Sequence, residues 1–526
     1  SVIRSQAIPD RTPSWQENLY SFESRNFNCI NVKSHMGCDR FGAFLGSATL
    51  TRAFNPDKLA DLRGEIATLT TVGVKNFLSK RSETQIKDLL SECDKPLDFL
   101  DDITLFKLMV KREAKVKLDS SCMSKHSPAQ NIIFHNKVVN LIFSPIFDTI
   151  KSRILYCLNP NILFYVDMNE EELAEWVYRR IGGEDIYYKA ELDFSKFDKS
   201  QDFYIKAYER FMYQAFGFDP ELLDIWMEGE YHCRAMSRDR DLAFTLSAQR
   251  RSGGSNTWIG NTLVTLGLLC MYYDLSKANA VLLSGDDSII FHSREIPDTS
   301  EEIITDTGFE TKFIRDAPAY FCSKFIVFCG DYVCFSPDPY KLCVRLGKTL
   351  NIRSYYELYE RYISFRDVTR DYDDGVFIEN LAPLVSRRYK CPLSEVYPAL
   401  CSIHCARANF KKFREIYPRP SGYTLVRGYT HLILLLKHGY KVYEERKVAK
   451  ELRSYVGFAV QMYLPDDDCQ KLCDLTTLRA QHGRISYLNS SRGCKEKKMS
   501  KLEKRSARKL AVDVDYVSNR ICAEYS

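Results

Sequence analysis

The sequence predicts an α+β protein built from several subdomains. At 526 residues the chain is longer than one hydrophobic core normally organises. Two short β-prone runs, residues 280–283 and 289–291, flank a Ser-Gly-Asp turn, which is the pattern of a β-hairpin. Residues 350–490 show mainly helical periodicity and no catalytic constellation, so we expect a helical C-terminal third.

Composition excludes a membrane-spanning or disulfide-framework protein. Hydrophobic residues make up 45% and charged residues 27% of the chain, as is typical of soluble globular proteins. The longest apolar run, residues 262–273, is too short to span a bilayer, and the polar N-terminus lacks a signal-peptide core. The 18 cysteines are scattered, often in apolar runs, which favours reduced thiols in a cytoplasmic protein. Because the chain begins with Ser1, we expect a cleaved, fused or frameshifted product, or a fragment.

The positive charge is concentrated in two places. The whole chain carries a formal net charge of +5, yet residues 492–509 alone hold nine Lys or Arg and two Glu. A second basic cluster consists of Lys107, Lys111, Arg112, Lys115 and Lys117. Local basic patches on a near-neutral body predict contact with a polyanion, the alternative being a solvated surface. From Lys111 to Lys117 the cations partly alternate, as on a strand with one cationic face, which could hold a triphosphate.

The next elements prepare a first pair of carboxylates. We expect helices in residues 56–79 and 82–100, and another from residue 169 to 180 that is acidic at its start and basic at its end. Residues 187–192 are strand-like, with Asp193 at the strand end and Asp198 in a turn before a helix over 201–216. A strand-end carboxylate points to a crevice where ligands gather. The alternative for Asp198 is that it caps the following helix.

A Gly-rich loop then leads into a long helix from Thr257 to about residue 274. Gly253 permits a close backbone approach, for example by a sugar-phosphate chain. Thr257 and Asn261 are four residues apart and therefore share one helix face. A simple loop and helix cap would explain the glycines but would leave this polar stripe on an apolar helix unexplained.

Two adjacent carboxylates, Asp286 and Asp287, are expected at the hairpin tip. Like charges this close are costly unless they are neutralised, and hard oxygen ligands suit Mg²⁺ or Mn²⁺. The alternative is a solvated Gly-Asp turn, which is common in proteins.

These three signals, in this order, resemble motifs A, B and C of viral RNA-dependent RNA polymerases. The flanking residues are similar to the alphavirus-like group, near tobamoviruses and closest to closteroviruses. Residues 111–119, 310–312 and 321–324 resemble motifs F, D and E, and the resemblance covers about residues 15–350.

The resemblance implies a right-hand polymerase of fingers, palm and thumb, with an antiparallel palm sheet that carries the Gly-Asp-Asp hairpin. Fingers with an N-terminal extension and motif F would occupy residues 1–185, palm motif A 186–204, a fingers insertion 205–248, palm motifs B to E 249–345, a mostly helical thumb 346–490, and a basic tail 491–526.

It also implies residue roles. Two Mg²⁺ ions, replaceable by Mn²⁺, would be held by Asp193, Asp286 and Asp287, and Lys312 would donate a proton to pyrophosphate. The nucleotide and its ribose 2′-hydroxyl would be bound by Asp198, Ser252, Gly253, Thr257 and Asn261. The triphosphate would be bound by Lys111, Arg112, Lys115 and Lys117.

The expected function is replication and transcription of a positive-strand viral RNA genome. Expected partners are the RNA template, nascent RNA, NTPs and viral helicase and methyltransferase proteins, with only indirect membrane association, in replication complexes of the host cytoplasm. One alternative is a reverse transcriptase, whose motif A would lack a polar ribose reader at the position of Asp198. Another is a non-catalytic RNA-binding or capsid protein, against which the four carboxylates weigh.

Overall fold

The structure is a computed structural model that describes residues 14–27, 35–82, 85–86, 99–111, 128–237, 242–347, 355–416, 442–443 and 484–485. These residues fall into two compact units. The first contains the described residues between 8 and 338 together with 383–391, and the second contains those of 339–382 and from 392 onward. The mixture of helices and mainly antiparallel sheets confirms the predicted α+β class.

A five-stranded sheet lies at the centre of the first unit. Its strands run in the order β3 (Ile162–Phe164), β7 (Ala280–Ser284), β8 (Asp287–His292), β4 (Tyr188–Phe194) and β9 (Thr311–Ile314). The predicted hairpin is present, because β7 and β8 pair antiparallel and Ser284 faces Asp287. The expectation of an antiparallel sheet holds for β7, β8, β4 and β9, but β3 pairs parallel with β7. The long crossover between β3 and β7 makes this parallel pairing possible.

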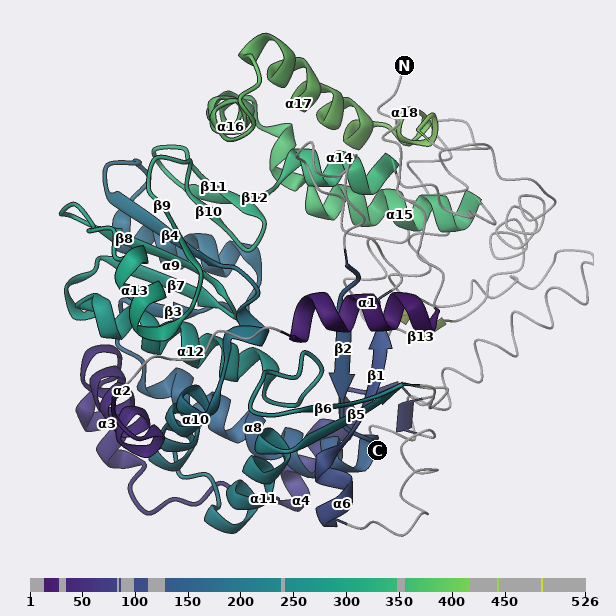
Figure 1. The fold of residues 1–526 in the computed structure, drawn as a ribbon. Coiled ribbons are helices and arrows are strands. Elements are labelled where there is room, and N and C mark those ends of the chain that lie inside the picture. The colour runs from purple at the N-terminus through teal and green to yellow at the C-terminus, as the bar shows by residue number, and fades with distance from the viewer. Residues whose placement is uncertain are drawn as a thin grey trace, which may run out of the picture. The chain divides into compact units, whose positions relative to one another are not determined.

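Alternate residues of the central strands enter two different cores. Val281 and Leu283 face helices α2 (Cys38–Ala53), α10 (Phe203–Ala215) and α12 (Thr257–Tyr272), which lie together on one side of the sheet (Figure 1). Ala280 and Leu282 pack instead with helix α9 (Glu170–Ile181) and with a three-stranded sheet. The strands of that second sheet are β10 (Tyr320–Phe321), β11 (Lys324–Phe328) and β12 (Val333–Pro337). The period-2 alternation of a strand therefore fixes which helices cover each face.

The ends of helices and strands mostly agree with the local sequence signals. One helix cap and one strand end differ from the prediction. Helix α9 begins with a capping box between Asn169 and Glu172 and ends at Gly182, whose φ is 73°. Helix α10 is capped by Asp202 and not by Asp198, since Asp202 accepts hydrogen bonds from the first-turn backbone. Strand β4 extends beyond the expected residue 192, so Asp193 lies within the strand instead of at its end.

A separate four-stranded sheet adjoins the N-terminal helix. Its order is β2 (Asn131–Phe134), β1 (Leu105–Val110), β5 (Cys233–Ser237) and β6 (Ala243–Leu246). Helix α1 (Trp15–Asn26) lies beside β1 and β2 in Figure 1, and its Phe22 stacks on Phe244 of β6. Among the residues of this unit that the structure describes, the other α-helices include α3 (Pro56–Asp61), α4 (Thr71–Ser79), α6 (Phe99–Thr104), α8 (Lys137–Cys157), α11 (Pro220–Tyr231) and α13 (Ser300–Thr307). The helix expected over 56–79 is thus two helices, and most of 82–100 lies outside the described residues.

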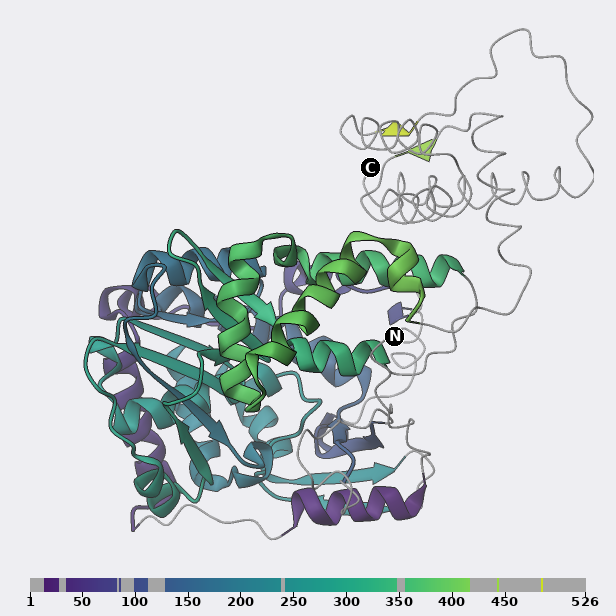
Figure 2. The same cartoon turned by 90° about the horizontal axis from the view of Figure 1, so that it is seen from above.

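The described part of the second unit is mainly helical, as predicted. It contains α14 (Pro339–Gly347), α15 (Tyr355–Val368), the start of α16 (Gly375–Tyr389), α17 (Leu393–Ala408), α18 (Phe410–Arg414) and two-residue strands β13 (Val442–Tyr443) and β14 (Arg484–Ile485). The green helices can be followed in Figure 2. Aromatic side chains pack in its core. The ring centroid of Tyr362 lies 5.3 Å from that of Phe410 and 5.4 Å from that of Phe413. Most of the expected helices beyond residue 416, and the basic segment 492–509, lie outside the described residues.

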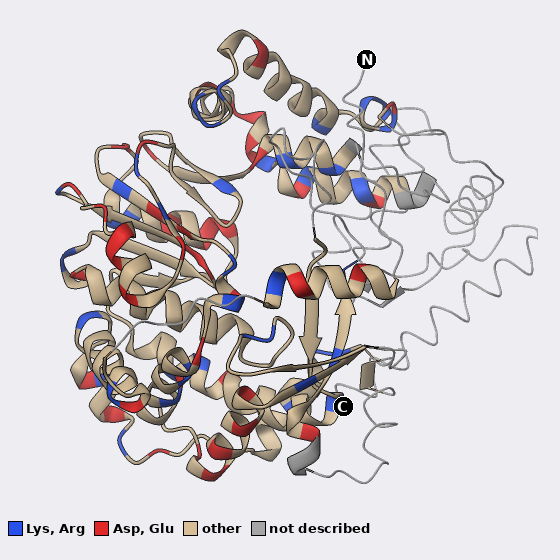
Figure 3. Cartoon of the chain, in the orientation of Figure 1, with Lys and Arg blue, Asp and Glu red and all other residues tan. Residues whose placement is uncertain are grey.

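Charged residues of both signs are interspersed along most described elements (Figure 3). Helix α15, for example, carries both acidic and basic residues. Among the residues that the structure describes, no helix is long and apolar enough to cross a membrane.

Candidate active site at the hairpin turn

Helix α12 holds the turn between β7 and β8 by its side chains. Gly285 has a φ of 63°, in the left-handed region that favours glycine. Its backbone N–H donates to the Thr262 hydroxyl at 2.9 Å, and its carbonyl accepts from the Thr265 hydroxyl at 2.8 Å. The Trp258 indole N–H donates to the Ser284 hydroxyl at 3.1 Å. Three side chains of one rigid helix therefore fix the turn that presents Asp286 and Asp287.

The structure brings the four predicted carboxylates close to one another. Leu192 pairs with Ser288, so Asp193 and Asp287 are the next residues along adjacent antiparallel strands. The pKa of Asp286 is raised from 3.8 to about 6 by burial and by the charges of Asp287, Asp198 and Asp193. Since the Asp286 side chain also remains exposed to solvent, the like-charge repulsion is the firmer of these causes.

This cluster has the donor chemistry of a divalent cation site. Carboxylate oxygens are the hard ligands that Mg²⁺ and Mn²⁺ prefer, and the repulsion that raises the Asp286 pKa would be relieved by a bound cation. Within the described ranges, no three His, Cys, Asp or Glu side chains already form a metal ligand set. The residues fit such a cation by charge and by ligand type.

A cavity of about 440 Å³ adjoins the cluster. Of the predicted site residues, its lining includes Asp198, Ser252, Thr257, Asn261 and Asp286. Its wall also contains cations and amides that sequence reasoning did not assign to the site, namely Arg25, Asn26, Gln130, Asn131, Lys196, Lys199 and Arg250. Arg25 and Asn26 come from helix α1, and no local sequence signal connects that helix to this cavity.

Asp198 and Asn261 form a hydrogen-bonded pair at the cavity wall. The Asn261 amide N–H donates to an Asp198 carboxylate oxygen at 2.9 Å, across 63 residues of sequence. The alternative role of Asp198 as the cap of α10 is wrong, because Asp202 performs that role. Asp198 lies instead in a 3₁₀ turn, Phe197–Ser200, with its carboxylate committed to Asn261.

The Gly-rich loop is held by its own hydroxyls and by strand β2. The Ser252 hydroxyl donates to the Asn131 carbonyl at 2.8 Å, and the Thr257 hydroxyl lies 2.7 Å from the Arg251 carbonyl. A Cβ at Gly253 would lie 2.8 Å from the Phe134 Cβ, so strand β2 accounts for this glycine. Gly253 is not among the residues that line the cavity, whereas Ser252 and Thr257 are.

The predicted cations are placed only in part. Lys312 lies on β9 directly opposite Asp193 in the strand register, and its side chain is exposed. Lys111 follows β1, is exposed, and is not among the residues that line the cavity. Arg112, Lys115 and Lys117 lie outside the described residues.

Comparison with known proteins identifies the class to which this fold and site correspond. Residues 1–416 match the family described as RNA dependent RNA polymerase, and the chain belongs to that family. It is 48% identical over 434 residues to the replicase polyprotein 1ab of Beet yellows virus, covering 82% of this chain and 14% of that protein. It is 35% identical over 421 residues to the replicase polyprotein 1ab of Grapevine leafroll-associated virus 3, covering 79% of this chain and 15% of that protein.

A more distant relative confirms the wider resemblance. The replicase large subunit of Sunn-hemp mosaic virus is 28% identical over 425 residues, covering 79% of this chain and 26% of that subunit. The predicted similarity to closterovirus and tobamovirus polymerases is therefore confirmed. This chain spans about one seventh of the length of the two replicase polyproteins.

Proposed function

We propose that this chain is the RNA-directed RNA polymerase segment of a viral replicase, which replicates and transcribes a positive-strand RNA genome. Family membership supports this assignment. The structural observation that supports it most directly is the set of four carboxylates from β4, the 3₁₀ turn and the hairpin. They lie beside a cavity whose lining includes the Asp198–Asn261 pair. The reaction is transfer of a nucleotide from an NTP to an RNA 3′-hydroxyl with release of pyrophosphate.

In this proposal the carboxylates of Asp193, Asp286 and Asp287 hold two Mg²⁺ ions, with Mn²⁺ able to replace them. The ions, when bound, lower the pKa of the 3′-hydroxyl and stabilise the charge of the leaving pyrophosphate. Lys312, opposite Asp193 on β9, donates a proton to the leaving group. The basic cluster of Lys111, Arg112, Lys115 and Lys117 binds the triphosphate by charge.

The Asp198–Asn261 pair reads the sugar of the incoming nucleotide. Asp198 presents an acceptor, and the second N–H of Asn261 presents a donor toward the cavity that both residues line. A ribose 2′-hydroxyl can satisfy both groups, whereas a 2′-deoxyribose leaves them unpaired. The hydroxyl that distinguishes RNA from DNA is thus bonded directly. Ser252, Gly253 and Thr257 shape the loop beside this pair.

The larger assembly is also a proposal. A division between compact units at residues 338 and 339 supports a thumb that begins near residue 346, after fingers and palm segments at the boundaries given above. One relative, from Raspberry bushy dwarf virus, is named methyltransferase/helicase/RNA-directed RNA polymerase and is 28% identical over 415 residues. We propose that this polymerase acts with such proteins, RNA and NTPs, in membrane-associated complexes of the host cytoplasm.

Primer extension on an RNA template with ribonucleotides and Mg²⁺ tests the proposal. Asp286→Asn keeps the side-chain shape but removes the charge, so incorporation should fall by at least about 10³ while RNA binding persists. Asp274→Asn is the matched control, since Asp274 forms a separate ion pair with Lys277 just beyond α12. Extension with deoxyribonucleotides alone would favour a reverse transcriptase. RNA binding without any extension by the wild type would favour a non-catalytic protein.

A further inference from the structure

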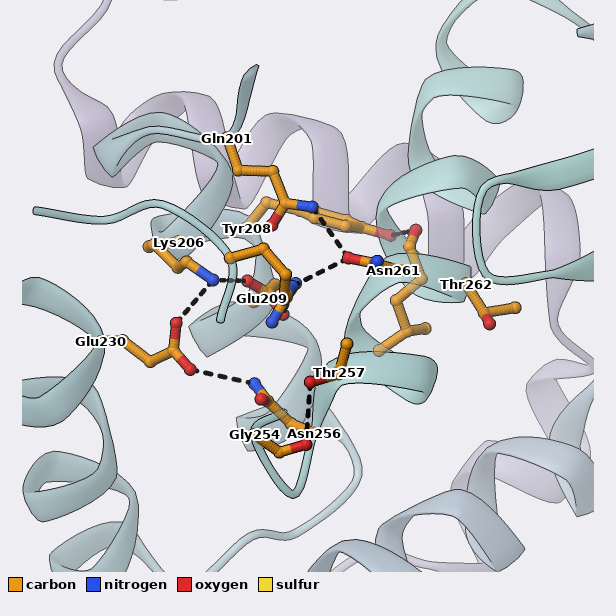
Figure 4. Close-up of polar contacts among 12 residues, drawn as sticks. Gln201, Lys206, Tyr208, Glu209, Glu230, Gly254, Asn256, Thr257, Asn261 and Thr262 are labelled. Carbon is orange, nitrogen blue, oxygen red and sulfur yellow. Dashed lines mark hydrogen bonds and ion pairs between the residues drawn. The ribbon is translucent and has the colours of Figure 1, made fainter. Parts of the chain in front are cut away.

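A cluster of buried charges lies beneath the Asp198–Asn261 pair. It consists of Lys206, Glu209, Glu230, Arg250 and Arg251, none of which is more than 4% exposed. The Lys206 ammonium lies 2.7 Å from Glu209 and 2.6 Å from Glu230 (Figure 4). The Arg250 guanidinium lies 2.5 Å from Glu209, and Arg251 lies 3.0 Å from Glu230. Three cations and two anions are therefore removed from water between α10, α11 and the Gly-rich loop.

Stability alone is a weak explanation for such a cluster. Moving an ion into a protein interior costs several kcal/mol, which pairing often fails to recover. Burial would raise the pKa of Glu230, but Lys206, Arg251 and Arg250 outweigh burial and lower it, so this carboxyl stays ionised. Burial would lower the pKa of Arg250, but Glu209 and Glu230 raise it, so the guanidinium keeps its charge and all its N–H donors.

Arg250 connects this cluster to both members of the sugar-reading pair. Its side-chain Nε–H donates to the Asn261 amide oxygen at 2.8 Å. Its backbone N–H donates to the Asp198 carbonyl at 3.0 Å. One buried residue therefore holds Asn261 by its side chain and Asp198 by its backbone, while Glu209 holds the far end of the guanidinium.

The donor-only character of a guanidinium fixes the orientation of the Asn261 amide. An amide can rotate by 180° and exchange its oxygen with its nitrogen, but Arg250 offers only N–H groups. The Asn261 oxygen must therefore face Arg250, and its NH₂ group must face Asp198 and the cavity. Gln201 also donates to this oxygen at 2.9 Å, but its own amide could rotate and accept instead. The donor-only guanidinium of Arg250 on one side and the acceptor-only carboxylate of Asp198 on the other therefore both oppose the flipped state of Asn261, whereas Gln201 does not.

We propose that Arg250 is a positioning residue for sugar selection, acting through Asn261 and backed by Glu209. The proposal rests on the sugar-reading role given to the Asp198–Asn261 pair. Arg250 holds the Asn261 amide with its donors toward Asp198 and the ribose 2′-hydroxyl. If the amide flipped, its oxygen would face the Asp198 carboxylate, and the donor offered to the hydroxyl would be lost.

A substitution at Gly260 on α12 can disturb the Arg250–Glu209 ion pair without changing either residue. A Cβ at this position would lie 2.4 Å from a Glu209 carboxylate oxygen and 2.6 Å from the Arg250 guanidinium. Gly260→Ala therefore displaces this ion pair without removing a charge. Gly267, on the same helix, is the matched control, because its Cβ would lie 2.7 Å from the Tyr208 ring instead. Both substitutions overfill the contact between α12 and α10, but only the first reaches Arg250.

The test measures kcat/KM for a ribonucleotide and its 2′-deoxy analogue on one RNA template. Arg250→Lys keeps the charge but cannot bond both Asn261 and Glu209 with a planar fork. It should narrow the ribose preference by about tenfold, mainly by slowing ribonucleotide use. The control Arg251→Lys alters the neighbouring buried pair with Glu230 and should leave the ratio unchanged. Gly260→Ala should narrow the ratio, whereas Gly267→Ala should not.

A mutant cycle separates positioning from general damage. In the Asn261→Asp background, adding Arg250→Lys should not change the sugar ratio further, because the residue through which Arg250 acts is already altered. If the ratio of ribonucleotide to deoxyribonucleotide use is unchanged in both Arg250→Lys and Gly260→Ala but narrowed in Asn261→Asp, the proposed role of Arg250 is wrong and the sugar-reading pair still stands. An unchanged ratio in Asn261→Asp itself would overturn the sugar-reading pair. If Arg250→Lys does not fold, Gly260→Ala and its control decide the question.

Discussion

Replacing Asp286 by Asn should make the metal-free protein more stable while it removes nucleotide incorporation. The folded protein raises the pKa of this carboxyl from 3.8 to about 6, through burial and then through the charges of Asp287, Asp198 and Asp193. Ionised Asp286 therefore destabilises the fold at pH 7. The full shift corresponds to an upper bound of about 3 kcal/mol. Because the side chain is more than a third exposed, solvent screening reduces the expected gain to about 1 kcal/mol.

The sign of this effect sets its pH dependence. A carboxyl whose pKa is raised on folding contributes its full stability below the unfolded-state pKa of 3.8 and loses it as pH rises through about 6. The advantage of Asp286→Asn should thus be present at pH 7 and absent near pH 4. Mg²⁺ should stabilise the wild type more than the variant, because the variant lacks one anionic ligand.

Urea unfolding in the presence of EDTA, followed by tryptophan fluorescence, measures this effect. All four tryptophans, at positions 15, 176, 226 and 258, belong to the unit that contains the site. Because the urea m-value grows with protein size to about 3 kcal/mol/M or more, a gain of about 1 kcal/mol should raise the urea midpoint by at most about 0.3 M. The control Asp274→Asn should instead lower the free energy of unfolding, because hydrogen bonds from Lys277 and Ser276 lower the pKa of Asp274 to about 2 and so favour its ionised form in the folded state. A variant less stable than the wild type at pH 7 in EDTA would refute the repulsion argument.

Three further outcomes are expected. Asn261→Asp and Asp198→Asn should each narrow the preference for ribonucleotides over deoxyribonucleotides by about tenfold, measured as relative incorporation on a homopolymer template. If the incorporation ratio is unchanged in both variants, the pair has only a structural role. Deleting residues 492–509 should weaken RNA binding and flatten the slope of log K against log salt, whereas an unchanged slope would argue against phosphate contacts. Burial raises the pKa of Glu191 from 4.5 to about 7 against the opposing charge of Arg388, so the wild type should lose stability relative to Glu191→Gln in thermal unfolding as pH rises from 4.5 through about 7, and parallel pH profiles would contradict this.

Local chemistry within a few residues was readable from the sequence. The hairpin around Gly285, the helix α9 with its acidic start and basic end, and the start of α12 at Thr257 depend on turn geometry, the helix dipole and periodicity. The carboxylates of motifs A and C could be assigned because their order and spacing resemble a known family. Misplaced details, such as the end of β4 and the cap of α10, are shifts of a few residues that local signals do not resolve.

The tertiary structure decided which distant groups meet. The sequence placed Asp198 and Asn261 at the same ribose, but it did not indicate that a buried arginine orients Asn261 or that helix α1 lines the cavity. The sequence predicted that Gly253 binds the nucleotide. In the structure a glycine is required there because a Cβ would collide with strand β2, which is more than 100 residues away in the chain. Arg250 gave no local signal, since an arginine in a loop is usually solvated. Its function depends on Glu209 and Asn261 reaching it from two different helices, and only the close contact of α10 with α12 brings those partners together.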